Sequence, residues 1–449
     1  MDGAPDRSNG ALPASSGSAA GREPDAAVRA PEGHRPGSSV PAEATGEGGA
    51  EGGAIHPLRR CFPDLPAWVD PLVSDLLDRA LVYQDEDDFV GVLACAEEAA
   101  RQAPRSVEAH HNRGLALMRL GRFEEARDAL SLALAIAPDD GESLELAAEL
   151  FINRLAPSAE RTMVGLEFAR RGRRSNAGRH RARGARLALL EGQALVDLGR
   201  SAEALGPLGV AEKLLVGDSA ARYEQGVALF ELCRFTGARR AFEAVLVAEP
   251  GHAHALYHLG LIAEREGNDG AARTLFDQAS ARDGKAFPPM PELSASGFAA
   301  RVQAVLGRLP GEIRTDLASI PIETAEIPSA EDLMAERPPL SPTILGLYRG
   351  LPLGRNTVPD DPPEPVARGA RGRQAHDPTA GGASTSGLPP SGSSLSAVPA
   401  RAIVLYRRNI LRSLHGLEEL DRAIERTLLH EVGHLRGEDD GSLRDRGLE

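Results

Sequence analysis

The sequence predicts a multidomain protein in which an all-α solenoid of helical repeats precedes a small α/β domain. A period of 34 residues runs from about residue 67 to 286. After it come three short apolar segments typical of strands and one long amphipathic helix. Two other stretches are rich in Gly, Pro and Ser and poor in large apolar residues, which predicts a disordered N-terminal arm and an internal linker.

The N-terminal arm covers residues 1–66. Gly, Ala, Pro, Ser and Glu dominate it, and large apolar side chains are nearly absent before Ile55. Such a segment buries too little apolar surface to offset the conformational entropy that folding removes. We therefore expect this arm to be disordered.

Small and large side chains recur at fixed positions of the 34-residue period. The clearest repeat begins at Val107, and the same frame fits from Ser219 and Ala253 and, more weakly, from Ala185 and near Val73. In the clearest repeat the small, large, turn and proline positions are occupied by Gly114, Leu117, Gly121, Ala126, Leu130, Ala133 and Pro138. Five repeats exceed the roughly three that a stable stack needs.

These positions resemble the tetratricopeptide repeat, a pair of helices that approach each other closely at the small residues. The resemblance implies a solenoid over residues 67–286. The residues named above pack the helices against one another. Binding is therefore left to the variable residues of the concave face, which typically docks a protein or peptide. We expect such a partner for this chain.

The stretch from about 140 to 170 is helical by pattern but departs from the repeat. Beside it, eight arginines lie between Arg170 and Arg186. We interpret this segment as a solvated inter-helix loop, with an anion or nucleic-acid contact as the alternative. Aromatic residues are absent from it and the formal net charge of the chain is −14, so nucleic-acid binding is not expected.

The C-terminal module covers residues 287–449. Phe298, Val302 and Val305 predict a helix, and strands are expected at 320–327, 344–348 and 402–406. Leu417, Leu420, Ile424 and Leu428 place one apolar stripe on a helix over 417–435. Residues 355–400 consist largely of Pro, Gly, Ser and Thr, which predicts a flexible insertion. It could instead act as a lid, but it has no apolar anchor.

The last predicted helix carries the one strong chemical signature of the sequence. His430 and His434 are four residues apart, so they project from one face of the helix and can ligate the same ion. Glu431 follows the first histidine, in the HExxH pattern of zinc hydrolases. Its carboxylate could accept a proton from an activated water and pass it to a leaving amine.

A third ligand is expected among the residues that follow His434. Gly437 can adopt positive φ and end the helix, which turns the chain back towards the ion. Asp440 then stands where the third ligand is needed, with Glu438 and Asp439 as competitors. Two histidines and one carboxylate suit zinc and leave a position open for water, although non-haem iron uses the same ligand set.

The pattern HExxHxxGxxD resembles the minimal zincin-like metallopeptidases. The likeness continues upstream through Leu345–Leu353 and Ile403–Ile410, and together these segments cover about a quarter of the chain. The resemblance implies a compact α/β zincin fold, a zinc ion on His430, His434 and Asp440, and Glu431 as catalytic base. The insertion between the two upstream segments departs from the family pattern.

Composition sets the remaining expectations. Cys61, Cys95 and Cys233 are odd in number and lack CxxC spacing, so disulfides and cysteine metal sites are not indicated. The sequence shows neither a signal peptide nor an apolar run long enough for a membrane span, which favours a cytoplasmic location. Two functions remain: a zinc metallopeptidase whose repeats recruit substrate or a partner protein, and a non-catalytic repeat scaffold with a structural metal site.

Overall fold

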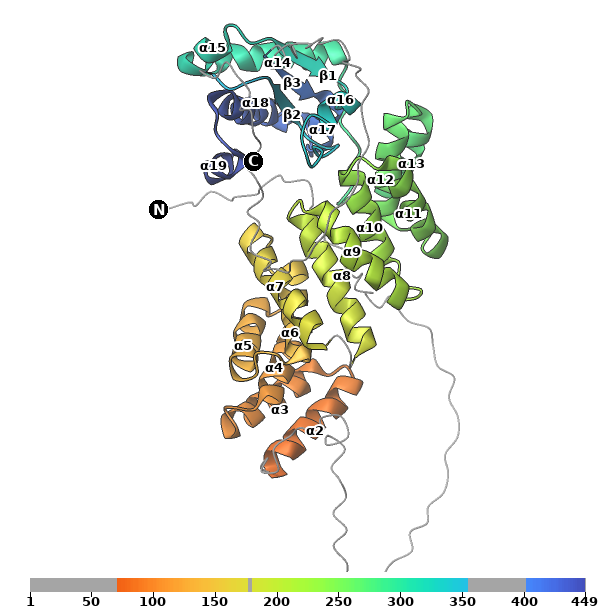
Figure 1. The fold of residues 1–449 in the computed structure, drawn as a ribbon, viewed down its shortest axis with the longest axis vertical. Coiled ribbons are helices and arrows are strands. Elements are labelled where there is room, and N and C mark those ends of the chain that lie inside the picture. The colour runs from red at the N-terminus through yellow and green to blue at the C-terminus, as the bar shows by residue number, and fades with distance from the viewer. Residues whose placement is uncertain (1–70, 177–179, 354–400, 449) are drawn as a thin grey trace, which may run out of the picture. The chain divides into compact units, whose positions relative to one another are not determined.

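The computed structural model describes residues 71–176, 180–353 and 401–448 (Figure 1). The predicted arm 1–66 and the predicted insertion 355–400 lie outside these residues. The chain divides into two compact units. The N-terminal unit holds the described residues up to Leu259 except Glu231–Cys233, and the C-terminal unit holds those three residues and the described residues from Gly260 onward.

The N-terminal unit is built from successive antiparallel helices, as the 34-residue period predicts. They are α2 (Pro71–Asp85), α3 (Phe89–Gln102), α4 (Val107–Arg119), α5 (Phe123–Ile136), α6 (Gly141–Glu149), α7 (Ala159–Asn176), α8 (Arg181–Asp197), α9 (Ser201–Leu214), α10 (Ala220–Glu231), α11 (Phe235–Ala248) and most of α12 (Ala253–Arg265). A π-helical turn, Leu150–Arg154, follows α6. The stretch that departs from the repeat is therefore helical, as expected.

The small residues of the repeats lie where two helices touch. A Cβ atom at Gly114 would lie 2.7 Å from Cγ of Leu130, and one at Gly226 would lie 2.6 Å from Cε1 of Phe242. Both distances are shorter than a carbon–carbon contact allows. The large side chain of the second helix therefore fills the space that glycine leaves in the first, which confirms the packing role inferred from the sequence.

The arginine-rich segment Arg170–Arg186 is not the solvated loop that the sequence suggests. Helix α7 runs to Asn176 and α8 begins at Arg181, and residues 177–179 lie outside the described part. Acidic partners hold the arginines on these helices: Glu191 for Arg170 and Arg173, Asp139 for Arg171, Glu167 for Arg174, Glu142 and Glu145 for Arg183, and Glu145 for Arg186. Six of the eight arginines, all six on helices α7 and α8, are thus paired with acidic side chains, so the loop interpretation was wrong.

The C-terminal unit combines helices with one small sheet. After α13 (Asp269–Arg282) come α14 (Ala295–Arg308), α15 (Gly311–Leu317), β1 (Ile322–Ala325), α16 (Ala330–Leu333), β2 (Gly346–Arg349), β3 (Ala402–Tyr406), α17 (Arg407–Arg412), a 3₁₀ turn (Leu417–Glu419), α18 (Leu420–Arg436) and α19 (Asp440–Asp445). The strand order is β1-β3-β2, with β1 parallel and β2 antiparallel to β3. The three predicted strands and the two predicted helices, here α14 and α18, are thus confirmed.

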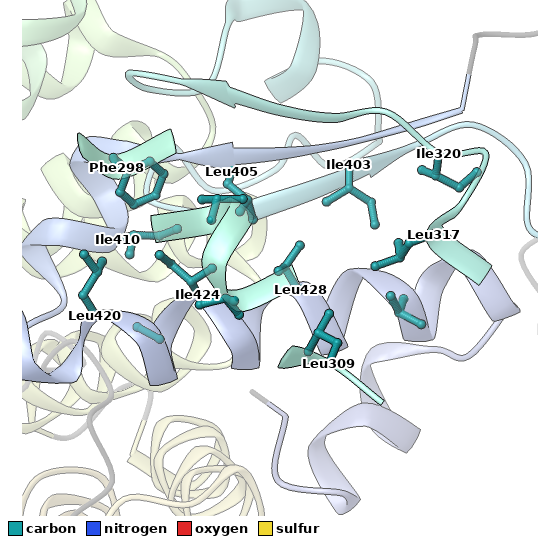
Figure 2. Close-up of a cluster of buried hydrophobic side chains, with 14 of the residues drawn as sticks. Phe298, Leu309, Leu317, Ile320, Ile403, Leu405, Ile410, Leu420, Ile424 and Leu428 are labelled. Atoms are coloured by element: carbon teal, nitrogen blue, oxygen red, sulfur yellow. The ribbon is translucent and has the colours of Figure 1, made fainter. Parts of the chain in front are cut away.

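A single apolar core joins the sheet to α14 and α18 (Figure 2). Ile403 and Leu405 of β3 face Ile424 and Leu428 of α18, and all four are fully buried. Leu417, which the sequence placed on the same stripe, lies in the 3₁₀ turn and is exposed. The core therefore fixes α18 against the sheet from Leu420 onward, and this positions the histidine motif.

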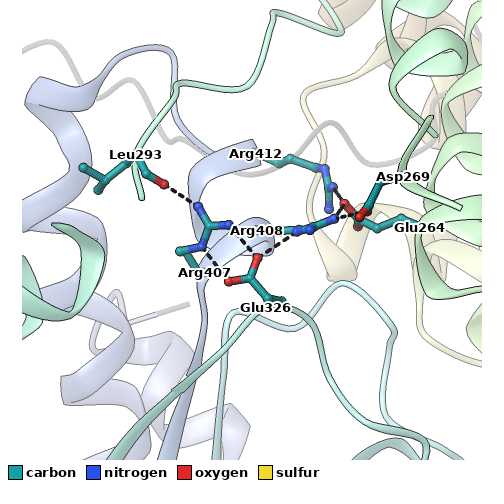
Figure 3. A network of polar contacts seen from close by, with 7 residues as sticks. All are labelled: Glu264, Asp269, Leu293, Glu326, Arg407, Arg408 and Arg412. Atoms are coloured by element: carbon teal, nitrogen blue, oxygen red, sulfur yellow. Dashed lines mark hydrogen bonds and ion pairs between the residues drawn. The ribbon is translucent and has the colours of Figure 1, made fainter. Parts of the chain in front are cut away.

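The part of the last repeat from Gly260 onward belongs to the same compact unit as the sheet. Arg408 of α17 lies between Glu326, which follows β1, and the carboxylates of Glu264 and Asp269 (Figure 3). The sequence places the domain boundary at 286/287, whereas the compact unit begins at Gly260. The limits 67–286 and 287–449 stay predictions.

Within the described residues, none of the helices is long and apolar enough to cross a membrane.

Candidate metal centre

Helix α18 presents the histidine motif and ends where the motif requires. Its apolar stripe lies on the sheet, and Gly437 follows it with φ of 88°, a left-handed conformation that glycine adopts without strain. The amide of Gly437 donates to the carbonyl of His434, and the amide of Glu438 donates to the carbonyl of Gly433. This cap, predicted from the sequence, turns the chain so that Asp440 returns towards the two histidines.

Two backbone carbonyls orient the histidine rings. Nδ1 of His430 lies 3.0 Å from the carbonyl oxygen of Leu448, and Nδ1 of His434 lies 3.1 Å from that of Glu438. A carbonyl oxygen only accepts hydrogen bonds, so both rings carry their proton on Nδ1. Nε2 is therefore the acceptor nitrogen in each ring, and the two Nε2 atoms are 3.0 Å apart. Such a second partner is typical of metal-binding histidines.

Asp440 completes the cluster. Its Oδ1 lies 3.2 Å from Nε2 of His434 and 3.7 Å from Nε2 of His430. One ligand atom from each of the three residues lies within 4.8 Å of the others. Of the two competitors, Glu438 pairs with Arg446 at 2.5 Å, and Asp439 accepts the amide of Ser442 as the N-cap of α19. The geometry thus favours Asp440 as the third ligand.

The chemistry of this donor set fits a divalent cation. Three acceptor atoms converge: two imidazole nitrogens and one carboxylate oxygen. Histidine nitrogens with a single carboxylate are ligands that zinc accepts in tetrahedral sites, and three protein ligands leave one position for water or substrate. The residues present therefore fit the metal that the sequence motif implies.

A glycine inside the motif lets the following helix approach. A Cβ atom at Gly433 would collide with the side chain of Leu443 in α19, and Leu443 is fully buried. The close approach of α19 to α18 holds the segment after Gly437 beside the histidines. It also brings the carbonyl of Leu448 to the ring of His430. Gly433 and Leu443 thus help to hold the three candidate ligands together.

Glu431 lies under the edge of the sheet. Its side chain is almost fully buried, at 4% exposure. Burial raises the pKa of Glu431 to about 8, the Asp440 carboxylate adds to this rise, and the backbone amide of Tyr348 in β2 opposes it by donating a hydrogen bond. The sequence places Glu431 next to the ligands, and the structure adds the strand that contacts it.

The aromatic hydroxyls near the site are already engaged. Tyr406 donates to Oδ2 of Asp332 at 3.0 Å, and Tyr348 donates to the carbonyl of Leu351 at 2.5 Å. Arg401 donates to the same carbonyl at 2.8 Å. The turn after β2 is thereby fixed, and the amide of Leu353 joins it to Leu435 of α18 at 2.7 Å. These tyrosines therefore have structural partners in the described residues.

Several supporting residues could not be found from the motif. The sequence does not single out the carbonyl of Leu448, the side chain of Leu443, or Gly346 of β2. Of these, only Gly346 could have been noticed in the sequence, because a glycine inside a predicted strand often indicates that another segment approaches the backbone closely. The other contacts depend on α19, a six-residue helix without a periodic pattern of its own.

Comparisons with known families agree with both parts of the chain. A family model of zincin-like metallopeptidases matches residues 376–448. Two models of the tetratricopeptide repeat match residues 107–140 and 223–291. The comparison with curated proteins found no match.

Solved structures similar to this chain include repeat proteins. YrrB, a tetratricopeptide repeat protein with an unusual peptide-binding site, is 21% identical, with 42% of this chain and 93% of that chain covered and a TM-score of 0.35. PilW, a type IV pilus biogenesis factor, is 18% identical, with 47% and 94% covered and a TM-score of 0.41. A tetratricopeptide repeat protein from Thermus thermophilus is 18% identical, with 44% and 98% covered and a TM-score of 0.32. By the family models, the chain is a tetratricopeptide repeat protein that carries a C-terminal zincin-like metallopeptidase domain.

Proposed function

We propose that the chain is a zinc-dependent metallopeptidase whose repeats recruit a substrate or a partner protein. One observation carries the proposal: a buried carboxylate, Glu431, stands one residue from His430, where three metal-ligand atoms converge. A metal that only stabilises the fold needs the three ligands and has no use for Glu431. A zinc ion held by His430, His434 and Asp440 would supply Lewis acidity to a substrate carbonyl and to water.

The residues of the chain would perform the proton transfers. In its ionised form Glu431 accepts a proton from the attacking water and later passes it to the leaving amine, which is general base and then general acid catalysis. The amide of Tyr348 holds the carboxylate at the edge of the sheet. Within the described residues β2 is an edge strand, so an extended peptide could pair with its outer side next to Glu431.

The repeats supply the second part of the proposal. Tetratricopeptide solenoids bind proteins or peptides along a concave surface formed by successive repeats. The family models place repeats in the same chain as the zincin-like domain. We infer that the repeats bring a protein or peptide to the chain that carries the metal centre. A cytoplasmic location accompanies this proposal as an expectation from the sequence.

The scaffold function has one observation in its favour. Glu431 is only 4% exposed. A substrate can therefore contact its carboxylate only if the residues around the three candidate ligands move apart. In that reading the ion on His430, His434 and Asp440 fixes α19 to α18 and has no catalytic role.

Metal content and peptidase activity of Glu431→Gln separate the two functions. We expect the wild type and the variant to bind equal amounts of zinc, and only the wild type to cleave a mixed peptide library. Loss of a general base lowers kcat by roughly 10²- to 10⁴-fold. Glu425→Gln, an exposed carboxylate on the same helix, serves as the matched control and should behave as wild type. Zinc in all three proteins with cleavage in none would support the scaffold, and a wild type without metal would refute the site.

A further inference from the structure

Gly346 of β2 faces the side chain of Glu431. A Cβ atom at this position would lie 2.9 Å from Oε1 and 3.2 Å from Cγ of Glu431. It would also lie 2.7 Å from Cγ2 of Thr427, one turn earlier on α18. All three atoms are closer than van der Waals contact. Glycine is therefore the residue that leaves room for the Glu431 carboxylate in its present position.

The same strand also holds the carboxylate by its backbone. Tyr406 of β3 donates its amide to the carbonyl of Leu345, so this pair is hydrogen-bonded across the strands. Pairs in an antiparallel ladder alternate, and the backbone groups of Gly346 and Tyr348 therefore point away from β3. This places the Tyr348 amide at the open edge of the sheet, where it donates to Glu431.

We propose that Gly346 is a positioning residue for Glu431, and this inference rests on the proposed peptidase function. Because Gly346 has no side chain, there is space beside it for the Glu431 carboxylate. The Tyr348 amide, two residues later, fixes the orientation of this carboxylate by a hydrogen bond. A methyl group at position 346 displaces the carboxylate from its present position and from that amide. General base catalysis depends on this geometry, because the base must lie within hydrogen-bond reach of the proton that it accepts.

Gly346→Ala in the full chain tests the proposal by steady-state kinetics. We expect kcat to fall roughly 10- to 100-fold, as small displacements in active sites do, with KM and zinc content close to wild type. Gly307→Ala is the matched control, because a Cβ at this glycine of α14 meets nothing within 4 Å. A Gly346→Ala enzyme with wild-type kcat would overturn the inference, whereas an inactive wild type would instead refute the peptidase function.

A second variant separates displacement of Glu431 from general strain. Thr427→Ser removes the methyl group nearest to the added Cβ and leaves Oε1 of Glu431 in its way. The double variant Gly346→Ala/Thr427→Ser should therefore fold as stably as wild type and still show the lowered kcat. Recovery of kcat in the double variant would assign the loss to Thr427 packing and overturn the inference.

Hydrogen exchange at the Tyr348 amide gives a readout that does not require activity. In wild type this amide donates a hydrogen bond to the Glu431 carboxylate, which should slow its exchange. We expect faster exchange in Gly346→Ala, by a factor similar to that in Glu431→Ala, while the amides of β3 keep their wild-type rates. Wild-type protection of Tyr348 in Gly346→Ala would show that the carboxylate has not moved, and the positioning role would be wrong.

Discussion

Buried polar groups are treated in opposite ways where the repeats stack and where α17 packs in the C-terminal unit. Between α8, α10 and α12 they are kept neutral. Glu224 is 1% exposed, accepts one hydrogen bond from Gln193, and its Oε2 lacks a partner among the described residues. Burial raises the pKa of Glu224 to about 8 and lowers the pKa of His258 to about 4. Both side chains therefore avoid charge near neutral pH.

Around α17 the polar groups are ionised and paired. Arg407 and Arg408 both bind Glu326, and hydrogen bonds from them lower the pKa of this carboxyl to about 2 (Figure 3). Arg412 is nearly buried, pairs with Glu264, and lies over the ring of Phe276. Each carboxylate has an arginine, so ionisation stabilises this network.

The contrast shows how each region depends on its neighbours. Stacked repeats present the same helix faces to one another, so a polar group at such a junction often meets an apolar ring: His258 stacks on Phe242 at 4.9 Å. The α17 network joins segments as distant as Glu264 and Arg412, and it specifies one arrangement of them through charge. The first region tolerates polar groups that stay neutral, and the second requires its charges.

The largest effect is expected from removing one partner of the charged network. Glu264→Ala leaves the nearly buried Arg412 without its carboxylate, which should lower the stability of the C-terminal unit by about 3–5 kcal/mol. Asp269→Ala removes an exposed partner of Arg408, and the loss of stability should be much smaller because solvent screens this pair. Hydrogen exchange of α18 amides measures both. Equal losses would show that the network is no more than a set of surface pairs.

The uncharged polar side chains between α8, α10 and α12 predict that the stability of the repeats depends on pH. Glu224 keeps its proton up to about pH 8 when folded, whereas the unfolded carboxyl ionises near its ordinary value of 4.5. Stability is therefore lost as pH rises between these values, by at most about 1.4 kcal/mol for each pH unit. Urea unfolding followed by circular dichroism at pH 5 and pH 8 measures this slope.

Glu224→Gln is the variant that sharpens the test. The glutamine does not ionise, so the loss of stability between pH 5 and pH 8 should be smaller than in wild type. Asp197, whose pKa is also raised by burial to about 7, remains in the variant and retains part of the slope. An unchanged slope in Glu224→Gln would mean that this carboxyl is already ionised in the folded repeats.

Local patterns were enough to predict much of both units. The positions of Gly114 and Leu130 follow from the 34-residue period, and His430, His434 and the Gly437 cap follow from spacing along one helix. The family models agree with both interpretations. These features depend on residues close in sequence, and short-range periodicity records them.

Contacts between distant segments could not be predicted. The short helices α15, α16, α17 and α19 have too few turns for a periodic pattern. The arginines after Arg170 looked like a solvated loop because Glu142 and Glu145, the partners of Arg183, lie about 40 residues earlier. Gly346 is separated from Glu431 by more than eighty positions in the sequence, so only the fold shows that they touch.

The smallest predicted effect concerns the glycines that space the repeats, and it uses the same substitution at two positions. Gly226→Ala places a Cβ 2.6 Å from the ring of Phe242 and should destabilise the N-terminal unit by about 1–3 kcal/mol. Gly209→Ala in α9 meets nothing within 4 Å and should stabilise it by about 0.5–1 kcal/mol through helix propensity. Urea unfolding measures both. A stabilising Gly226→Ala would show that the ring moves aside, and that repeat spacing is set by the apolar side chains and does not depend on glycine.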